Sequence, residues 1–324
     1  MKSVLVTGGA GYIGSILVRL LLEEGYKGRI IDNLRYGGET VVELLNDQNF
    51  EFIRGDVNLK QDLQKAVKNM DYLVHLAAIV GDPACRNEPE LAKETNLEST
   101  KNLYHVANQN GVKKFVYAST CSNYGKMEDP DGYVHEESKL APVSLYAETK
   151  VESERFLLGQ DTDQICKPTS LRFSTVYGLS PRIRFDLTVN EFTKELALGR
   201  ELVVFGEQFW RPYCHVKDLA RSVLYVLEND DGTTDSNVYN VGDTSENYQK
   251  QMIVEEIKKQ IPSAKIKYVK KEEDPRDYKV SFEKINRDLG FQITKKVPDG
   301  IAQIRKIIDE QFLPDPDDAK YRNS

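Results

Sequence analysis

The chain has 324 residues, which is enough for about two domains of roughly 150 residues or for one large α/β domain with an appended lobe. It carries 44 Lys and Arg against 51 Asp and Glu, a net charge of −7, so no overall positive field attracts nucleic acid or anionic lipid. Hydrophobic residues make up 40% of the chain, enough to fill a core, and no window approaches the roughly 18 apolar residues that a membrane span needs.

The first half of the chain alternates short apolar runs, rich in β-branched residues, with longer segments of helical period. This alternation is typical of βαβ units around a parallel sheet. Strands are predicted at residues 3–7, 29–32, 51–54, 72–76, 114–119 and 169–173, and helices at 13–24, 59–68, 91–110 and 144–158. Because the connections between these segments are short, we expect an α/β fold with a doubly wound parallel sheet of the Rossmann type.

The pattern becomes less regular after about residue 175. Helices are predicted at 187–198 and 216–228 and strands at 202–205 and 238–241, with both types mixed further on. We therefore expect a cofactor-binding domain at residues 1–175 and a smaller C-terminal α/β substrate lobe at 176–313. Residues 314–324 hold two prolines and three aspartates and almost no apolar side chains, so we expect a disordered tail there.

The four cysteines, Cys85, Cys121, Cys166 and Cys214, are widely spaced, and the chain contains neither a CxxC nor an HExxH sequence. Neither a disulfide framework nor a metal site is therefore expected. The N-terminal MKSVLVTGG offers too short an apolar stretch for a secretory signal. Reduced thiols in the cytoplasm fit this composition best.

A glycine-rich sequence, TGGAGYIG at residues 7–14, joins the first predicted strand to the first predicted helix. Gly8 permits a tight turn, Gly11 removes the side chain where the backbone approaches a pyrophosphate, and Gly14 lets helix and strand pack closely. Free N–H groups at the start of the helix then bind the phosphates. The sequence therefore predicts a dinucleotide site, although a glycine-rich turn alone is a weak signal.

Asp32 stands eighteen residues after Gly14, at the end of the second predicted strand. A carboxylate there can accept hydrogen bonds from both ribose hydroxyls of NAD and repels the 2′-phosphate of NADP. We therefore predict NAD as the cofactor. Arg35 weakens the choice slightly, because an arginine can accommodate the extra phosphate.

Tyr146 and Lys150 are four residues apart on a predicted helix, so their side chains share one face. Half-ionising a tyrosine near pH 7 requires lowering its pKa by roughly 3 units from about 10, or about 4 kcal/mol. An ammonium about 4 Å away at an effective dielectric near 20 supplies a comparable energy. We therefore expect Lys150 to lower the pKa of Tyr146, which would act as a general base toward a substrate hydroxyl.

The spacing alone is not specific, because Tyr213 and Lys217 repeat it. Most such pairs are solvated helix faces, and we interpret Tyr213 and Lys217 in that way. The pair at residues 146 and 150 differs because it follows a predicted strand that ends in hydroxyl side chains.

Thr120 lies in that hydroxyl-rich strand end, STCSNYG at residues 119–125. The carboxyl ends of parallel strands face the crevice where ligands bind, so Thr120 can donate a hydrogen bond to a developing carbonyl oxygen. Two alternatives are a loop that caps its own backbone and a thiol nucleophile at Cys121. The thiol is less favoured because no histidine close in sequence could activate it.

The glycine turn, the hydroxyl strand end and the YAETK sequence together resemble the extended short-chain dehydrogenase/reductase family, in particular its NAD-dependent nucleotide-sugar epimerases and dehydratases. The resemblance covers nearly the whole chain. It includes DNL at 32–34, GDV at 55–57, HLAA at 75–78, LRF at 171–173, VYG at 176–178 and RPYCHVKD at 211–218.

The resemblance implies a role for each matching residue. Thr120, Tyr146 and Lys150 would be the catalytic set, and Arg211 and Arg276 would bind a nucleotide diphosphate, with Thr120 and Thr175 as further substrate contacts. The cofactor contacts implied are Gly8, Gly11, Tyr12, Ile13, Gly14, Asp32, Asn33, Asp56, Val57, Leu76, Ala77, Ala78, Tyr146 and Lys150, with Asp56 and Val57 beside the adenine. A homodimer through the helices at 91–110 and 144–158 is implied as well.

Departures from the family pattern bear on the reaction. The 4,6-dehydratases usually carry Thr-Asp-Glu where this chain has Thr120-Cys121-Ser122, so dehydration is disfavoured. Many 4-epimerases carry Asn at the position of Thr175, which puts their usual substrate contact in doubt. The runs at 76–85, 173–193 and 274–281 resemble a subgroup that includes C4 dehydrogenases of GDP-linked heptose.

The leading hypothesis is an NAD-dependent enzyme that oxidises C4 of a nucleotide-diphosphate sugar, with epimerisation and net dehydrogenation both open. A non-catalytic NAD-binding regulator or scaffold on the same fold is the alternative, because fold alone does not give function. The complete set of Tyr146, Lys150 and Thr120 argues against it. A dehydrogenase of small free alcohols is disfavoured because it would not need the large C-terminal lobe.

Overall fold

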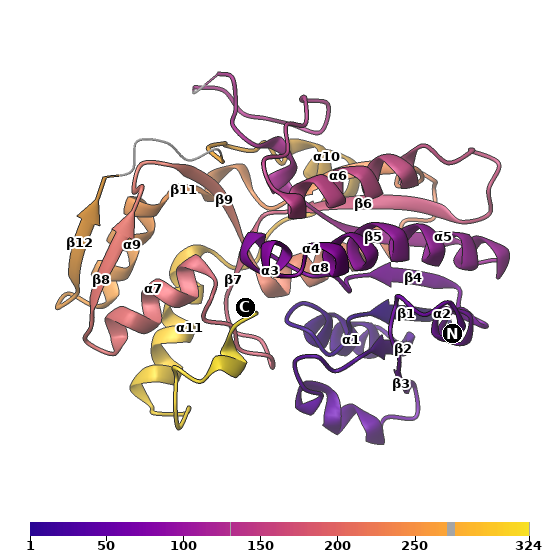
Figure 1. The fold of residues 1–324 in the computed structure, drawn as a ribbon, viewed down its shortest axis with the longest axis horizontal. Coiled ribbons are helices and arrows are strands. Elements are labelled where there is room, and N and C mark those ends of the chain that lie inside the picture. Colours follow the sequence, from indigo (N-terminus) through magenta and orange to yellow (C-terminus); the bar gives the residue numbers. More distant parts are fainter. Residues whose placement is uncertain (130, 271–275, 324) are drawn as a thin grey trace.

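A computed structural model describes residues 1–129, 131–270 and 276–323. Its larger half is a seven-stranded sheet in the order β10-β6-β5-β4-β1-β2-β3, and all neighbouring strands are parallel (Figure 1). The strands are β1 (Ser3–Thr7), β2 (Lys27–Asp32), β3 (Phe50–Arg54), β4 (Tyr72–His75), β5 (Lys114–Thr120), β6 (Lys167–Phe173) and β10 (Asn237–Val241). The predicted doubly wound α/β fold is confirmed.

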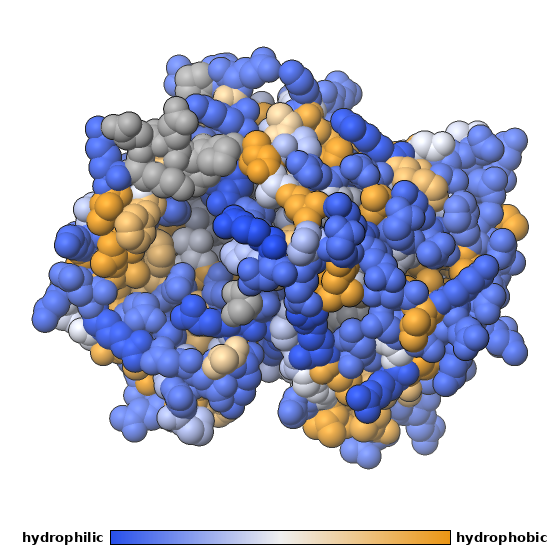
Figure 2. Space-filling view, in the orientation of Figure 1, coloured by the Kyte–Doolittle hydropathy of each residue, from blue (hydrophilic) through white to orange (hydrophobic). Residues whose placement is uncertain are grey.

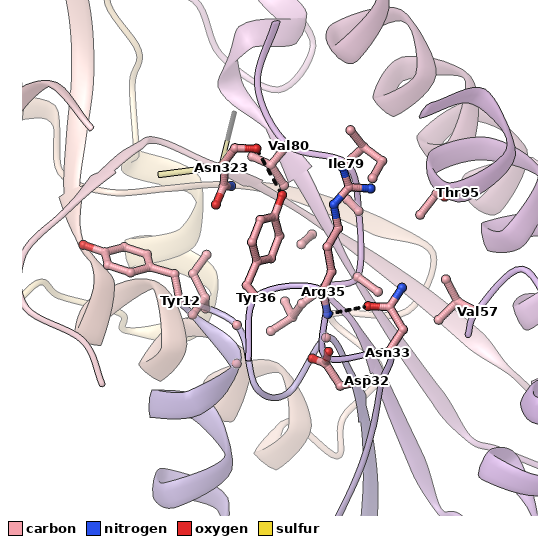
Figure 3. Close-up of a pocket in the computed structure, with 18 of the residues that line it drawn as sticks. Tyr12, Asp32, Asn33, Arg35, Tyr36, Val57, Ile79, Val80, Thr95 and Asn323 are labelled. Carbon is pink, nitrogen blue, oxygen red and sulfur yellow. Dashed lines mark hydrogen bonds between the residues drawn. The ribbon is translucent and has the colours of Figure 1, made fainter. Parts of the chain in front are cut away.

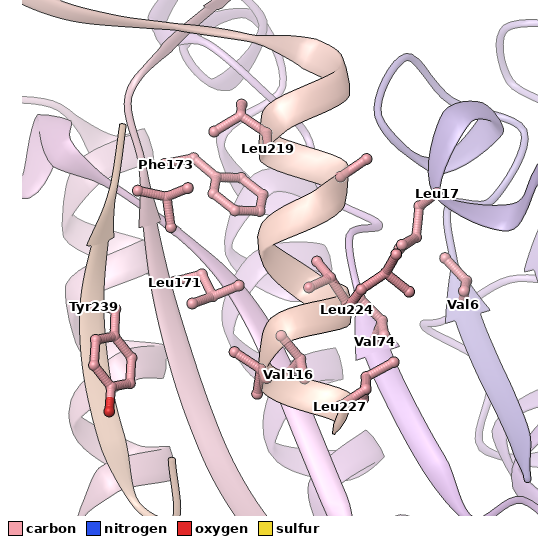
Figure 4. Packing of buried hydrophobic residues seen from close by; sticks show 14 of the residues in the cluster. Val6, Leu17, Val74, Val116, Leu171, Phe173, Leu219, Leu224, Leu227 and Tyr239 are labelled. Atoms are coloured by element: carbon pink, nitrogen blue, oxygen red, sulfur yellow. The ribbon is translucent and has the colours of Figure 1, made fainter. Parts of the chain in front are cut away.

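The two faces of the sheet bury alternate residues of each strand, because successive side chains of a strand point to opposite sides. On one face, Val6 and Val116 pack with α1 (Gly14–Glu23) and α8 (Val216–Glu228). On the other face, Leu5 and Phe115 pack with α2 (Lys60–Val67), α5 (Ser99–Gln109) and α6 (Leu145–Leu158). Figure 4 shows α8 lying across the first of these faces, with Leu219 and Leu227 against the strands.

The seventh strand corrects the expected division of the chain. Residues 238–241 were expected in the C-terminal lobe, but β10 pairs with β6 from Asn237↔Thr169 to Val241↔Phe173. The helix before it, α8, is also part of the large half, since it packs on α1. The chain therefore leaves the sheet after β6, builds part of the lobe, and returns to complete the sheet.

The predicted helix at 91–110 is three consecutive segments rather than one. They are α4 (Pro89–Lys93), a π-helical turn η2 (Glu94–Glu98) and α5. The carbonyl oxygen of Asn96 accepts hydrogen bonds from the hydroxyls of Thr100 and Ser153, both at 2.8 Å. Its side-chain amide bonds both backbone groups of Ile79, at 2.8 and 3.0 Å, so the wide turn directs Asn96 toward the loop after β4.

The smaller lobe is built on α7 (Thr188–Ala197), α9 (Lys250–Gln260) and α11 (Val297–Asp309). A three-stranded sheet, β11-β9-β7, links it to the large half, and β12 and β8 form a parallel pair at its outer side. These strands are β7 (Thr175–Tyr177), β8 (Glu201–Phe205), β9 (Trp210–His215), β11 (Asn247–Gln249) and β12 (Lys265–Val269). Figure 2 shows apolar side chains over β8, β12 and α9 and a hollow between the two halves.

The remaining short elements are α3 (Asp82–Asn87), α10 (Glu283–Leu289) and the short helices η1 (Glu39–Asn46), η3 (Cys121–Tyr124), η4 (Thr244–Glu246) and η5 (Ala319–Tyr321). The last of these lies in the segment that was expected to be disordered. In the structure that segment instead packs on the lobe, where the Tyr321 ring meets Phe185 with centroids 5.6 Å apart. The composition of the segment could not predict this contact, because a single aromatic residue anchors an otherwise polar segment.

Among the described residues, no helix combines the length and the apolar character that crossing a bilayer demands.

Candidate active site

The glycine turn after β1 has the geometry that its sequence predicts. Gly8 has φ +70°, and a Cβ there would lie 2.9 Å from the backbone nitrogen of Ala77. At Gly14 a Cβ would lie 2.3 Å from the carbonyl oxygen of Gly8, so any side chain would force the turn away from α1. The turn therefore brings bare backbone to the start of a helix, which is the arrangement that binds phosphate.

Asp32, at the end of β2, is hydrogen-bonded to the backbone of the glycine turn. Its carboxylate accepts hydrogen bonds from the backbone N–H groups of Ala10 (3.0 Å) and Leu34 (2.8 Å). Burial raises the pKa of Asp32, and these two hydrogen bonds oppose that rise. Arg35, the residue that weakened the choice of NAD, forms an ion pair with Glu88.

The turn, Asp32 and the strand ends open into one cavity of about 540 Å³, a size typical of ligand sites (Figure 3). Fifteen of the eighteen residues predicted for the site line it. They are Gly8, Gly11, Tyr12, Ile13, Gly14, Asp32, Asn33, Asp56, Val57, Leu76, Ala77, Ala78, Thr120, Tyr146 and Lys150. Segments far apart in sequence thus meet at the carboxyl edge of the sheet.

Thr120 ends β5 and caps η3, where its hydroxyl oxygen accepts a hydrogen bond from the backbone N–H of Ser122 at 3.1 Å. That bond uses a lone pair and leaves the hydroxyl proton available for donation. Cys121 is fully buried and its thiol donates to the carbonyl oxygen of Arg172 at 3.2 Å. Burial raises the pKa of Cys121, which removes support for the thiol alternative.

Tyr146 and Lys150 lie on the first two turns of α6. The ammonium of Lys150 is 3% exposed, donates to the carbonyl oxygen of Ala118 at 2.8 Å, and lies 4.7 Å from the centre of the Tyr117 ring. Burial lowers the pKa of Lys150 to about 7.

The pKa of Tyr146 departs from expectation. Burial raises it above the ordinary value, whereas the sequence predicted that a lysine would lower it. The groups that do lower it are the positive charge of Arg184 and a hydrogen bond with Thr120, and they are outweighed. The physical reason is that burial penalises the charged forms of both groups, the phenolate of Tyr146 and the ammonium of Lys150.

Helix α6 is fixed in place by a cap and by a buried ion pair. The Ser144 hydroxyl accepts a hydrogen bond from the backbone N–H of Ala147 at 3.3 Å, which satisfies the start of the helix. One turn beyond Lys150, Glu154 receives the guanidinium of Arg172 at 2.5 Å and the hydroxyl of Ser170 at 2.8 Å, both from β6. Helix α6 is therefore fixed to the strand beside it.

Three predicted substrate contacts do not line the cavity: Thr175, Arg211 and Arg276. Arg211 donates to the carbonyl oxygen of Trp210 at 2.6 Å and lies 5.2 Å from the centre of the Tyr278 ring. Arg276 pairs with Asp82 at 2.7 Å, at the start of α3.

Tyr213 and Lys217 do not form a solvated helix face, as was expected of them. Tyr213 belongs to β9 and is buried, whereas Lys217 is in the first turn of α8 and exposed. The period-four interpretation was wrong because a strand ends between the two residues, at His215.

Sequence reasoning left several polar residues of the cavity unassigned, among them Tyr36, Arg182, Arg184 and Asn323. Arg182 and Arg184 lie in the SPRIRFD run at 180–186, which served only as a point of resemblance. Their spacing marks no recognisable motif. Asn323 lies in the tail, where composition argued against any structure. Within the described ranges, no cluster of His, Cys, Asp and Glu suited to a metal ion occurs.

The chain is similar in sequence to known proteins. The model of the NAD dependent epimerase/dehydratase family matches residues 4–242. The UDP-glucose 4-epimerase 3 of Oryza sativa subsp. japonica is 31% identical over 269 residues, covering 74% of this chain and 71% of that protein. The dTDP-glucose 4,6-dehydratase of Streptomyces niveus is 28% identical over 313 residues, covering 93% of this chain and 90% of that protein.

A similar fold is found in the crystal structure of UDP-glucuronic acid 4-epimerase from Bacillus cereus in complex with UDP-glucuronic acid and NAD. It is 26% identical, has a TM-score of 0.84, and covers 96% of this chain and 100% of that one.

Proposed function

Because this chain belongs to the NAD dependent epimerase/dehydratase family, we propose that it oxidises C4 of a nucleotide-diphosphate sugar, with Tyr146, Lys150 and Thr120 as the catalytic residues. It is an NAD-dependent enzyme of the extended short-chain dehydrogenase/reductase type. The observation that carries the proposal is that the three side chains line the same cavity as the glycine turn and Asp32.

The residues of the cavity fit the cofactor. A Cβ at Gly8 would press on the backbone of Ala77 and one at Gly14 on the carbonyl oxygen of Gly8, so the turn keeps a bare backbone, and Asp32 lines the same cavity with a carboxylate that can accept hydrogen bonds from a ribose. NAD, when bound, supplies the acceptor and later the donor of a hydride. The hydrophobic walls, among them Val57, Leu76 and Ala77, exclude water from that chemistry.

Tyr146 takes the proton of the C4 hydroxyl in the proposed reaction. The Thr120 hydroxyl donates to the same substrate oxygen and holds it in place as it becomes a carbonyl. Lys150 is close enough to the cavity to bind the nicotinamide ribose and, once protonated, to favour the phenolate. Burial raises the pKa of Tyr146. The positive charges that enter or form in the filled site must therefore lower this pKa again before the phenolate can form.

Three points of the proposal go beyond the family assignment. The position C4 is supported by the 4-epimerase relatives and by the phenol and hydroxyl at the strand end. Arg211 and Arg276 are proposed to bind the nucleotide diphosphate after releasing their present partners, and Thr175 to contact the sugar. A homodimer, with α5 and α6 at the contact, remains a prediction, as does the GDP-heptose subgroup.

Incubation with UDP-, GDP-, dTDP- and CDP-sugars tests the proposal, with product NMR in deuterated water. Conversion of one sugar at C4 is expected for the wild-type protein, and Tyr146→Phe is expected to abolish it while NAD binding changes less than about twofold. Tyr133→Phe, at an exposed tyrosine outside the cavity, serves as the matched control. Near wild-type turnover in Tyr146→Phe would exclude the proposed mechanism, and products altered at another carbon would exclude the proposed position.

A further inference from the structure

Residues 315–323, which we call the strap, run from the end of the lobe toward the large half of the molecule (Figure 1), and Asn323 at their end lines the cavity. Asp317 anchors the strap by an ion pair with Lys194 at 2.7 Å, and the Lys194 side chain is fully buried. At Tyr321 the backbone oxygen accepts a hydrogen bond from the N–H of Phe185 at 2.8 Å. The strap is therefore held to the lobe at two points before it reaches the cavity.

The end of the strap, Asn323, lies at the cavity itself. Its carbonyl oxygen accepts a hydrogen bond from the Tyr36 hydroxyl at 3.2 Å, as Figure 3 shows, and its side-chain oxygen accepts one from Arg182 at 2.5 Å. Its backbone N–H donates to Asp186 at 3.3 Å. Asn323 thus connects the loop after β2 with the loop after β7 across the cofactor side of the cavity.

Arg182 has the properties of a ligand contact. It is 7% exposed, its guanidinium lies 3.8 Å from the centre of the Tyr36 ring, and its Nε is buried with no hydrogen-bond partner. Burial lowers its pKa to about 10. No carboxylate of the described residues forms an ion pair with it, although the charges of Asp186 and Asp32 favour its protonated form from farther away, and a buried cation without a direct counter-charge is costly. An anionic group in the cavity would supply that charge.

The loop that carries Arg182 rests on the phosphate-binding turn. The Ser180 hydroxyl donates to the carbonyl oxygen of Tyr12 at 2.6 Å, and the Tyr12 hydroxyl donates to the carbonyl oxygen of Gly178. Tyr12 lies two residues before the start of α1, whose first turn attracts phosphate through its free N–H groups. Arg182 therefore lines the cavity beside the turn, where the diphosphate of a dinucleotide is expected.

We propose that Arg182 binds a pyrophosphate oxygen of the cofactor, and that the strap holds Arg182 in position and closes the cavity over the bound dinucleotide, so that NAD leaves slowly. The inference rests on the cofactor site of the proposed function. It assigns a binding role to Arg182 and a positioning role to Asn323, Tyr36 and the Asp317 anchor.

The first experiment compares two ligands of the purified protein, ADP-ribose, which contains the pyrophosphate, and adenosine, which does not. Arg182→Met is expected to weaken ADP-ribose roughly tenfold to a hundredfold, the range for hydrogen bonds to charged groups, and to leave adenosine within about twofold. Arg182→Lys, which keeps the charge without the guanidinium fork, is expected to recover part of the affinity. An equal loss for both ligands would overturn the role of Arg182, because a merely structural change would weaken both.

The second experiment measures the release of NADH, followed by its fluorescence after mixing with excess NAD. Asn323→Ala and Asp317→Asn are expected to speed release by about tenfold, although Asp317 does not line the cavity. Lys306→Ala, at an exposed lysine of α11 outside the strap, is the control. Thermal unfolding of each variant verifies that the fold is intact.

The outcomes separate the two proposals. Unchanged release in both strap variants would overturn the strap while leaving the cofactor site in place. A wild-type protein that binds neither NAD nor ADP-ribose would overturn the cofactor site itself. Weakened binding of NADP alone in Arg182→Met would assign the guanidinium to a 2′-phosphate and so overturn its pyrophosphate role.

Discussion

Replacement of Lys150 by methionine is expected to stabilise the cofactor-free protein while abolishing its turnover. The ammonium of Lys150 has one hydrogen-bond acceptor, the carbonyl oxygen of Ala118, and its side chain is almost entirely buried. Burial lowers its pKa from 10.5 to about 7. A residue to which we assign a catalytic role is thus held where its charged form is disfavoured, and methionine fills the same space without the charge.

The direction and the size of the expected change in stability follow from the linkage between proton binding and folding. Between pH 7 and 10.5 the unfolded chain keeps the Lys150 proton and the folded chain loses it, so this residue makes stability rise with pH across that window. Below pH 7 the folded chain must bear the buried charge. A shift of 10.5 − 7 = 3.5 units corresponds to about 5 kcal/mol, at about 1.36 kcal/mol per unit. Lys150→Met is expected to recover a large part of this at pH 6.5 and less at pH 8.5.

Urea unfolding of protein stripped of cofactor measures the effect, at pH 6.5 and at pH 8.5. The informative quantity is the difference between Lys150→Met and wild type, because groups that do not interact with Lys150, such as Cys166, whose pKa burial raises, cancel from it. Lys139→Met, at a side chain that is 83% exposed, is the control. If Lys150→Met is the less stable protein at pH 6.5, or if the difference does not shrink by pH 8.5, the reasoning about the buried ammonium is wrong.

Three further substitutions test other parts of the site. Gly14→Ala places a Cβ 2.3 Å from a backbone oxygen of the turn, so the affinity for NAD, measured by titration, should fall at least about tenfold. The control is Gly28→Ala, whose Cβ meets side chains at 3.6 Å or more and which should leave the affinity unchanged. Equal affinities of the two variants would contradict the role of the glycine turn in binding NAD. Glu154→Gln leaves the buried Arg172 without its counter-charge, so urea unfolding should show a loss of about 3–5 kcal/mol, and a loss under about 1 kcal/mol would contradict the locking of α6. Asp32→Asn removes a carboxylate that repels a 2′-phosphate, so the ratio of NAD to NADP affinity should drop, and an unchanged ratio would count against its assigned role.

The strands, the helices and most of the cavity could be predicted because their signals are local. Alternation of Val4, Leu5 and Val6 between two cores, and the glycine spacing that follows, depend on periods of a few residues. The predicted boundaries differ from the observed ones by two residues or fewer at most of the elements, for example Val216–Glu228 for α8.

The features that were predicted wrongly have a different cause, because they depend on contacts between residues distant in sequence. That β10 joins β6 is decided by a pairing between residues 237 and 169, and nothing in the strand itself reveals which sheet it enters. The order of the tail depends on Phe185 and Lys194, over 120 residues away. The pKa of Tyr146 could not be read from its spacing to Lys150, because spacing carries no information on burial.

Three unfavourable features of the fold lie around the cavity. The ammonium of Lys150 and the guanidinium of Arg182 are both buried without an ion pair among the described residues, and Leu34, beside Asp32, has φ +62°. Each of these features lowers the stability of the protein without ligand. A bound dinucleotide can offset this loss with phosphate charge and hydroxyl contacts. Ligand binding stabilises a fold by mass action, and the relief of such costs strengthens that binding. The same residues therefore account for costs of the fold without ligand and, in our proposal, for slow release of the cofactor.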